Sequence, residues 1–359
     1  MRKKTLAIRF YNAENLGDDL FLYIAAERYK NVNIITNGAQ VPADISGKSV
    51  RVLTPIKSVV LRGLDKLFHT NLALKSITKK VDAFAYIGGS ILIEGEDIKR
   101  WYSERALFTS SKAPAFILGS NIGPYSSADF LSIVEDIFKA SADVCLRDAN
   151  SYALVSGLDN VRLSTDIAFS LNTEAYAAIS STKNVIVSII DSYKKFGTDV
   201  ARKYDRAIAS LTKKLTEEGY RVTYMSFCKY EGDEKACERI ASLLPREIRE
   251  KVQLFNYRGN LQESLQLLAS SELIIGSRFH ANILGLVFGK KVLPMAYSDK
   301  TINILKDMNF PGQIIDIRKI DSFDVDTVDF DSIPIVDVSA QKKLAETQFQ
   351  ELDKVLTRA

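Results

Sequence analysis

Short apolar runs alternate with amphipathic stretches of helical length along almost the whole chain. Brief runs rich in Val, Ile, Leu and Phe are typical of buried strands, whereas apolar residues spaced three or four apart predict helices. Strands are expected at residues 6–10, 32–36, 50–54, 83–87, 115–118, 144–146, 161–163, 185–190, 221–227, 252–254, 273–275, 291–295 and 314–316. Helices are expected at residues 18–29, 59–74, 101–110, 128–141, 150–156, 199–218, 233–243, 262–269, 281–288 and 300–308.

Strands that alternate with helices in this way predict parallel sheets covered by helices on both faces. At 359 residues the chain is too long for one core and suits two domains. A polar stretch rich in small residues, 172–184, separates the two halves of the pattern. We therefore expect two Rossmann-like α/β domains, at residues 1–175 and 183–318, that face each other across a central cleft.

The remaining residues, 319–359, predict a loop and then a helix. Residues 320–338 contain six aspartates and a proline but no lysine or arginine, which favours a surface loop. Residues 340–356 carry apolar side chains at helical spacing, and we expect this helix to return to the N-terminal domain.

Composition narrows the class of protein. A net charge of +4 with interleaved acids and bases gives no basic face for nucleic acid. The three cysteines lack metal-site spacing, which fits a reducing cytoplasm. No clustered His or Cys and no Walker-type loop is visible, so neither a metal nor a cofactor is expected. No apolar segment reaches the length of a membrane span.

Residues 56–81 combine six basic side chains and one acid with an apolar face. We interpret this stretch as the solvated face of a helix over the domain core, with His69 in a structural role. The alternative is a basic amphipathic helix that binds peripherally to an anionic membrane surface.

The richest local signal is at residues 272–289, where an apolar run meets Gly276 and polar residues follow at the start of a helix. The N-terminus of a helix attracts anions through its free backbone N–H groups and its dipole. Arg278 adds a planar fork suited to phosphate or carboxylate, and His280 can move a proton near neutral pH. The chain has only two histidines, so the position of His280 beside Arg278 is informative. Together with the helix N-terminus, these residues predict an enzyme site for a phosphorylated, carboxylated small molecule.

Four strand-end loops in the first half are polar or rich in glycine, and glycine lets a backbone approach a ligand closely. Their candidate binding or catalytic residues are Asn15, Gly17, Asp18, Gly88, Gly89, Asn121 and Arg147. Each loop also has a simpler interpretation. The glycines could serve turn geometry alone, Asp18 could cap a helix, and Arg147 could form a surface ion pair with Asp148.

Seven short blocks along the chain form a recognisable set. They are N-L-G-D at 15–18, I-G-G-S at 87–90, G-S-N-I-G-P at 119–124, L-R-D-A-N-S at 146–151, T-D-I-A-F at 165–169, S-R-F-H-A at 277–281 and Y-S-D-K at 297–300. In this order the set resembles the polysaccharide pyruvyl transferase family, and it covers most of the chain. Ser90 departs from the family pattern, which usually has a third glycine there.

The resemblance implies a fold similar to GT-B glycosyltransferases and a transferase of cell-surface polysaccharide biosynthesis. In the implied reaction, phosphoenolpyruvate donates an enolpyruvyl unit to two hydroxyls of a free or lipid-linked saccharide, forming a pyruvate ketal. Arg147 and Arg278 would bind the donor, and His280 would act as the acid/base. Asp18 would orient or deprotonate the acceptor hydroxyl. The other substrate-binding candidates are Ser277, Lys300, Asn15, Gly17, Gly88, Gly89 and Asn121.

Two residues and the activity itself have alternative interpretations that stay open. His280 could be a histidine satisfied by a neighbouring carbonyl, and Lys300 could be a solvated lysine at a helix start. The rival activity is a GT-B-type glycosyltransferase that uses a nucleotide-sugar donor, with Arg278 and the helix N-terminus holding the diphosphate. The third hypothesis is a non-catalytic binding protein descended from such enzymes.

Overall fold

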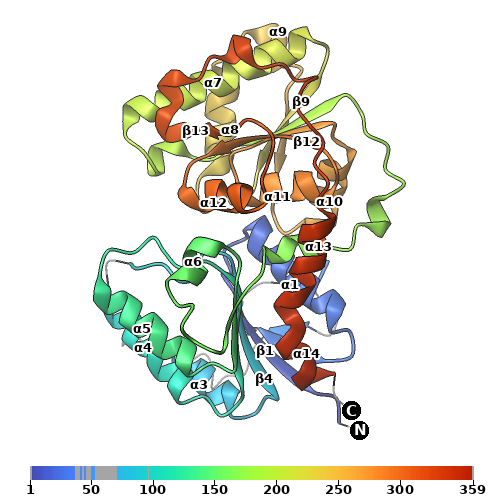
Figure 1. Cartoon of the computed structure of the whole chain (residues 1–359). Coiled ribbons are helices and arrows are strands. Elements are labelled where there is room, and N and C mark those ends of the chain that lie inside the picture. The colour runs from blue at the N-terminus through green and yellow to red at the C-terminus, as the bar shows by residue number, and fades with distance from the viewer. Residues whose placement is uncertain are drawn as a thin grey trace. The chain divides into compact units, whose positions relative to one another are not determined.

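The computed structural model describes residues 2–36, 41–42, 44–45, 50–52, 71–95 and 97–357. The chain divides into two compact units (Figure 1). Unit 1 contains Met1–Asn12, Asp18–Ser170 and Lys343–Ala359, and unit 2 contains Ala13–Gly17 and Leu171–Lys342. Residues 319–342, which the sequence analysis grouped with the C-terminal helix, are therefore part of unit 2. The short segment Ala13–Gly17 also belongs to unit 2, although the chain on both sides of it belongs to unit 1.

Unit 1 is built on a parallel sheet with the strand order β3-β2-β1-β4-β5-β6-β7. Its strands are β1 Thr5–Arg9, β2 Asn33–Thr36, β3 Val50–Val52, β4 Ala83–Ile87, β5 Ala115–Ser120, β6 Asp143–Leu146 and β7 Val161–Leu163. The helices between them are α1 Leu16–Arg28, α3 Leu72–Thr78, α4 Lys99–Thr109, α5 Ala128–Lys139, α6 Ala149–Ala153 and the 3-10 turn η1 Ile167–Ser170. Strands β4 and β5 are buried along their whole length, as continuous apolar runs in parallel sheets predict.

The C-terminal segment consists of α13 Ser339–Ala345, η6 Glu346–Phe349 and α14 Gln350–Leu356. It belongs to unit 1 from Lys343 onward, whereas the first residues of α13 belong to unit 2. Phe349 is fully buried and meets the Tyr29 ring edge-on, with the ring centroids 6.1 Å apart. The buried amide of Gln348 accepts a hydrogen bond from the Gly119 backbone N–H (2.9 Å) and donates one to the Thr165 carbonyl (2.7 Å). This segment therefore supplies unit 1 with apolar contacts and with a side-chain partner for two buried backbone groups.

Unit 2 repeats the architecture with a parallel sheet in the order β10-β9-β8-β11-β12-β13. Its strands are β8 Asn184–Ser188, β9 Arg221–Ser226, β10 Gln253–Asn256, β11 Leu273–Gly276, β12 Lys291–Ala296 and β13 Ile315–Asp316. Its helices are α7 Thr198–Glu217, α8 Asp233–Ser242, α9 Arg246–Arg249, α10 Leu261–Ser270, α11 Phe279–Val287 and α12 Asp299–Asp307. The 3-10 turns are η2 Glu174–Tyr176, η3 Ser192–Lys194, η4 Ile317–Ser322 and η5 Val325–Thr327.

The two-domain α/β fold class predicted from the sequence is confirmed, and element ends differ from prediction by a few residues. Helix α9 was not predicted, because four mostly polar residues carry no periodic signal. Most of the predicted helix 59–74 and of the basic stretch 56–81, His69 included, lies outside the described residues. Residues 72–74 form the start of α3, which continues to Thr78. Among the residues that are described, no helix combines the length and hydropathy needed to cross a membrane.

Candidate active site

The carboxyl end of β11 carries Arg278, whose guanidinium is buried and held by two carboxylates. Its Nε donates to Asp233 (2.8 Å), its Nη2 contacts the other oxygen of Asp233, and its Nη1 donates to Glu231 (2.8 Å). The Arg278 side chain is 7% exposed and that of Asp233 is fully buried. A guanidinium has five N–H donors, so this arrangement uses more than half of its capacity within the protein.

Glu231 and Asp233 follow β9, and they join this part of the chain to Arg278 before α11 and to Lys195 after η3. Asp233 opens α8 and also accepts the backbone N–H groups of Phe227 (3.0 Å) and Cys228 (2.9 Å), just after β9. Burial pushes the pKa of Glu231 upward, but the charges of Arg278 and Lys195 outweigh it and hold the pKa at about 2. The site is therefore charged and rigid around Arg278.

His280 lies in the first turn of α11 and packs against the backbone of Gly17. A Cβ atom at position 17 would lie 1.8 Å from His280 Nδ1, 2.4 Å from Cε1 and 2.5 Å from Cγ. The imidazole also meets the Phe279 ring edge-on, with centroids 5.0 Å apart. Only a glycine at position 17 leaves room for the imidazole in this position.

The segment Ala13–Gly17 is held on unit 2 by the loop after β9. Asn15 forms an antiparallel bridge with Cys228, and the Leu16 N–H donates to the Phe227 carbonyl (3.0 Å). The thiol of Cys228 donates to the Ala13 carbonyl (3.5 Å), and Asn15 Oδ1 accepts the Gly17 N–H (3.0 Å). Asn15 thus occupies the capping position of α1, and its side-chain oxygen already accepts the Gly17 N–H. The ligand contact predicted for Asn15 stays a prediction.

Strand β12 delivers Tyr297 and Lys300 to the same edge of the sheet. Lys300 Nζ lies 5.3 Å from the Tyr297 ring centroid and 5.9 Å from that of Phe279, while Lys195 Nζ is 4.8 Å from the Tyr297 ring. Burial alone would raise the pKa of the Tyr297 phenol, but Lys300, Arg278 and Lys195 outweigh it and lower the pKa below its usual value. Lys300 makes no ion pair with a carboxylate in the part of the chain that the structure describes.

Ser277 is fully buried, and its hydroxyl shares a 2.8 Å hydrogen bond with the Tyr204 hydroxyl. Its backbone N–H donates to the Ser188 carbonyl, and the Arg278 N–H donates to the Ser188 hydroxyl. These contacts fasten the turn that leads into α11. The ligand contact predicted for Ser277 stays a prediction.

Unit 1 has its own buried arginine at the carboxyl end of β6. Arg147 Nη1 donates to Asp166 (2.7 Å), and Nη2 donates to Asn121 (2.6 Å) and Ser90 (3.5 Å). Arg147 and Asp166 are almost completely buried, with side chains 2% and 0% exposed. The predicted surface ion pair between Arg147 and Asp148 is wrong, because Asp148 instead caps α6 by accepting the Ser151 N–H.

The glycine-rich loop after β4 meets this arginine. A Cβ at Gly89 would lie 2.3 Å from Arg147 Nη1, so glycine is required there for the guanidinium to lie against the backbone. A Cβ at Gly88 would lie 2.5 Å from Ile91 and 3.8 Å from Asp18 Oδ1. Asp18 lies inside the first turn of α1 rather than at its cap, and its catalytic role stays a prediction.

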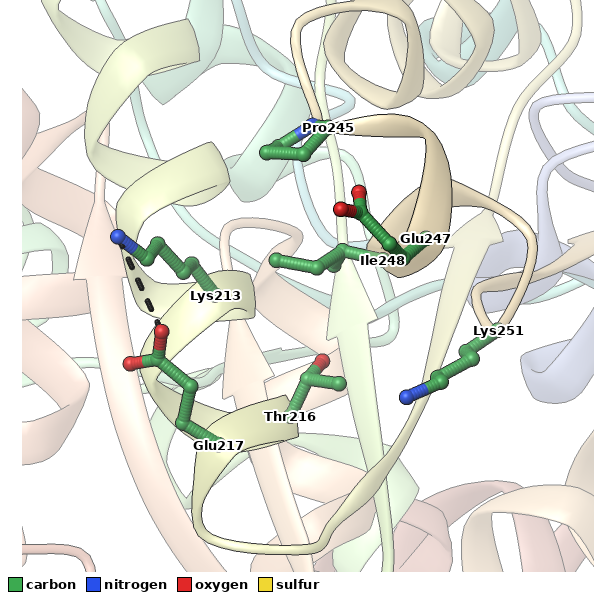
Figure 2. Close-up of a pocket in the computed structure, with 7 residues that line it drawn as sticks. All are labelled: Lys213, Thr216, Glu217, Pro245, Glu247, Ile248 and Lys251. Carbon is green, nitrogen blue, oxygen red and sulfur yellow. Dashed lines mark ion pairs between the residues drawn. The ribbon is translucent and has the colours of Figure 1, made fainter.

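A separate pocket of about 390 Å³ lies in unit 2 near the amino ends of β9 and β10 (Figure 2). It is lined by Lys213, Thr216, Glu217, Pro245, Glu247, Ile248 and Lys251. Figure 2 shows Lys213 and Glu217 joined by an ion pair (3.8 Å) on α7, which ends just before β9 begins. Ligands of open α/β sheets bind at the carboxyl ends of strands, so this pocket is not the candidate active site.

A sequence model of one family, polysaccharide pyruvyl transferase, matches residues 15–299 and so spans Gly17, Arg147, Arg278 and His280. The chain belongs to the polysaccharide pyruvyl transferase family. It is therefore a transferase. The family resemblance drawn from the short sequence blocks is confirmed, and the match contains every candidate site residue named above except Lys300, which follows its last residue.

A curated relative of this pyruvyl transferase family member is the amylovoran biosynthesis protein AmsJ of Erwinia amylovora. The two are 24% identical over 305 residues, which cover 75% of this chain and 71% of AmsJ. Among solved structures, Anabaena HepE in complex with UDP and glucose is similar, with a TM-score of 0.59 at 12% identity over 100% of both chains. The UDP-GlcNAc 2-epimerase of Methanocaldococcus jannaschii has a TM-score of 0.58 at 9% identity, over 98% of this chain and 99% of that one. These likenesses show a GT-B-like fold.

The structure gathers the predicted residues into two clusters, one on each unit. Unit 2 brings Gly17, Arg278, His280 and Lys300 together, and unit 1 brings Gly89, Asn121 and Arg147 together. Sequence reasoning missed the three carboxylates that pair with these arginines: Asp166 with Arg147, and Glu231 and Asp233 with Arg278. It also missed Lys195 and Tyr297. Asp166 and Tyr297 lie inside family blocks, which was a usable signal. That the two clusters serve one cleft stays a prediction.

Proposed function

We propose that the enzyme transfers a pyruvyl group from phosphoenolpyruvate to two hydroxyls of a saccharide in cell-surface polysaccharide biosynthesis. The observation that carries the proposal is that the carboxyl ends of the unit 2 strands bring the imidazole of His280 to the same end of the sheet as Arg278, Lys300 and Lys195, with the Phe279 ring in contact with both His280 and Lys300. Phosphoenolpyruvate carries a phosphate and a carboxylate beside a methylene carbon that must be protonated. Such a donor suits a cationic pocket that also contains an acid/base.

In the proposed reaction, protonated His280 gives its proton to the methylene carbon, and an oxocarbenium-like centre forms at the adjacent carbon. One sugar hydroxyl attacks that carbon and gives its proton to the imidazole, and then the second hydroxyl displaces inorganic phosphate, which takes up the proton of that hydroxyl. The products are the cyclic ketal and phosphate, and the imidazole regains its proton from an attacking hydroxyl. An acid/base in this position contributes typically 10²–10⁴-fold in rate.

Lys300 is the group that we propose for the donor phosphate. Arg278 already bonds Asp233 and Glu231, whereas the contacts given for Lys300 are with the side chains of Tyr297 and Phe279 and include no carboxylate. A flexible ammonium of this kind can turn toward an anion with little loss of internal contacts. The direct donor contact of Arg278 is the weaker proposal, because it competes with two internal ion pairs.

The deciding experiment measures phosphate release from phosphoenolpyruvate with a panel of acceptor glycans, and confirms the ketal by mass spectrometry. We expect His280→Ala to lower kcat by about 10²–10⁴ while phosphoenolpyruvate still binds in calorimetry. Lys300→Ala should weaken donor binding by about 1.5–3 kcal/mol. Its matched control is Lys251→Ala, which removes the same charge from the same unit at the pocket of Figure 2. Equal losses in both lysine variants would contradict the assignment of Lys300.

The alternative activity is a GT-B-type glycosyltransferase with a nucleotide-sugar donor. Titration of nucleotide sugars in the same calorimetric series separates the two, because binding of a nucleotide sugar without binding of phosphoenolpyruvate would support the alternative. Addition of EDTA to the assay tests the expectation that no metal is needed. A cytoplasmic location, a lipid-linked acceptor and membrane contact through residues 56–81 remain proposals, which fractionation of cells and assays with lipid-linked glycans would test.

A further inference from the structure

Gly17 was a candidate for close approach to a ligand, but in the structure the group that approaches it is the imidazole of His280. The three ring atoms nearest to an added Cβ would be Nδ1 at 1.8 Å, Cε1 at 2.4 Å and Cγ at 2.5 Å. Cγ is the ring atom attached to the side chain's own Cβ. Rotation of the ring about χ2 leaves Cγ in place, so an added methyl group would force a change of χ1 or of the backbone.

The contact closes a ring of interactions within unit 2. The segment Ala13–Gly17 bonds Phe227 and Cys228, whose N–H groups are held by Asp233. Asp233 in turn holds Arg278 through two contacts. Arg278 is followed two residues later by His280, which returns to Gly17. Each link fixes the next, so the imidazole is supported by its own helix and by a distant part of the chain.

We infer that Gly17 is a positioning residue for His280, and that the segment Ala13–Gly17 acts as a strap that completes the catalytic half of unit 2. The inference rests on the proposed function of His280 as the acid/base. Within the strap, Gly17 has no side chain, and the imidazole of His280 lies against its backbone. A shift of that ring by about 1 Å is enough to cost on the order of 10²-fold in rate.

Two considerations separate this role from a general structural one. Gly17 lies in the first turn of α1, where alanine is intrinsically the better helix former. Local backbone preference alone therefore predicts that Gly17→Ala stabilises the protein. Any loss must come from the clash with the imidazole, and it should vanish when the imidazole is removed.

The first test is a thermal double-mutant cycle with Gly17→Ala, His280→Ala and the double variant. We expect Gly17→Ala alone to lower Tm by roughly 2–10 °C, as overpacking does. In the His280→Ala background the same change should leave Tm unchanged or raise it. The matched control is Gly197→Ala, where an added Cβ meets nothing within 4 Å. A fall of Tm that is equal in both backgrounds would overturn the inference.

The second test uses the fact that the chain has only two histidines. In protein labelled with ¹⁵N at histidine, the imidazole signals of His280 are assigned by their loss in His280→Ala. Gly17→Ala should shift the His280 signals, while Gly197→Ala should leave them in place. Unchanged His280 signals in Gly17→Ala would refute the positioning role.

Kinetics complete the set. Gly17→Ala should lower kcat by about 10²-fold and leave KM for phosphoenolpyruvate within a few-fold of the wild-type value. A rise in KM with unchanged kcat would instead make Gly17 a substrate contact and overturn the inference. If the wild-type enzyme does not use phosphoenolpyruvate, the proposed function fails, but the thermal cycle and the NMR spectra still decide whether Gly17 positions His280.

Discussion

Arg278→Ala distinguishes a ligand-binding arginine from a structural one. The substitution leaves Asp233, which is fully buried, without its bidentate partner, and it leaves Glu231 with only Lys195 at 3.1 Å. Breaking a buried pair by removing one partner typically costs about 3–5 kcal/mol. Because Asp233 keeps the N–H groups of Phe227 and Cys228, we expect the lower end of that range, about 3 kcal/mol.

The assay is urea denaturation followed by far-UV circular dichroism, with the transition of unit 2 compared between variants. Arg278→Lys should recover little stability, because an ammonium cannot bridge both oxygens of Asp233 and reach Glu231. Arg278→Met combined with Asp233→Asn removes both charges and should be more stable than Arg278→Ala alone. The reasoning is refuted if Arg278→Ala keeps wild-type stability and loses only affinity for phosphoenolpyruvate, since the guanidinium would then serve the ligand.

Two further predictions concern one residue on each unit. The folded pKa of Glu231, about 2, lies below the ordinary value, so its ion pairs stabilise the protein above about pH 4.5, and that stability is lost as the pH falls toward 2. Glu231→Gln should therefore lower the free energy of unfolding by roughly 1–3 kcal/mol at pH 7. Between pH 6 and pH 3 the free energy of unfolding should fall less in this variant than in the wild type, as measured by denaturation curves. Identical pH dependence in the two proteins would contradict this. Phe349→Ala, which removes a fully buried ring from unit 1, should cost about 3–5 kcal/mol in the same measurement, whereas Leu344→Ala, at an exposed position on the same segment, should cost far less.

The sequence predicted the fold well, because buried parallel strands leave a strong local signal. The strand at residues 83–87 is a continuous apolar run between Asp82 and Gly88, and β4 has those bounds. Four-residue helix α9 had no such signal. The division of the chain was harder to predict. Nothing in the composition of Ala13–Gly17 indicates that these residues join unit 2, because their partners, Phe227 and Cys228, are more than two hundred residues away.

The site was predicted only in part, because the sequence shows local patterns but not which distant residues come together. A helix start that carries Arg278 and His280 is visible locally, but the carboxylates that neutralise Arg278 are not. Glu231 and Asp233 belong to a short acidic turn that by itself resembles a solvated loop. Gly17 was predicted to allow a ligand close to the backbone, and only the three-dimensional structure shows that an imidazole of the protein lies there instead.

The position of Gln348 has a consequence for how the protein is made. Its amide satisfies the buried Gly119 N–H and the Thr165 carbonyl in unit 1, yet the ribosome adds it after all of unit 2. Until then the nascent unit 1 holds polar groups whose burial without partners costs about 1–3 kcal/mol each. Most of unit 1 is therefore synthesised before unit 2, but unit 1 can complete these two hydrogen bonds only after residues 343–359 have followed unit 2 out of the ribosome.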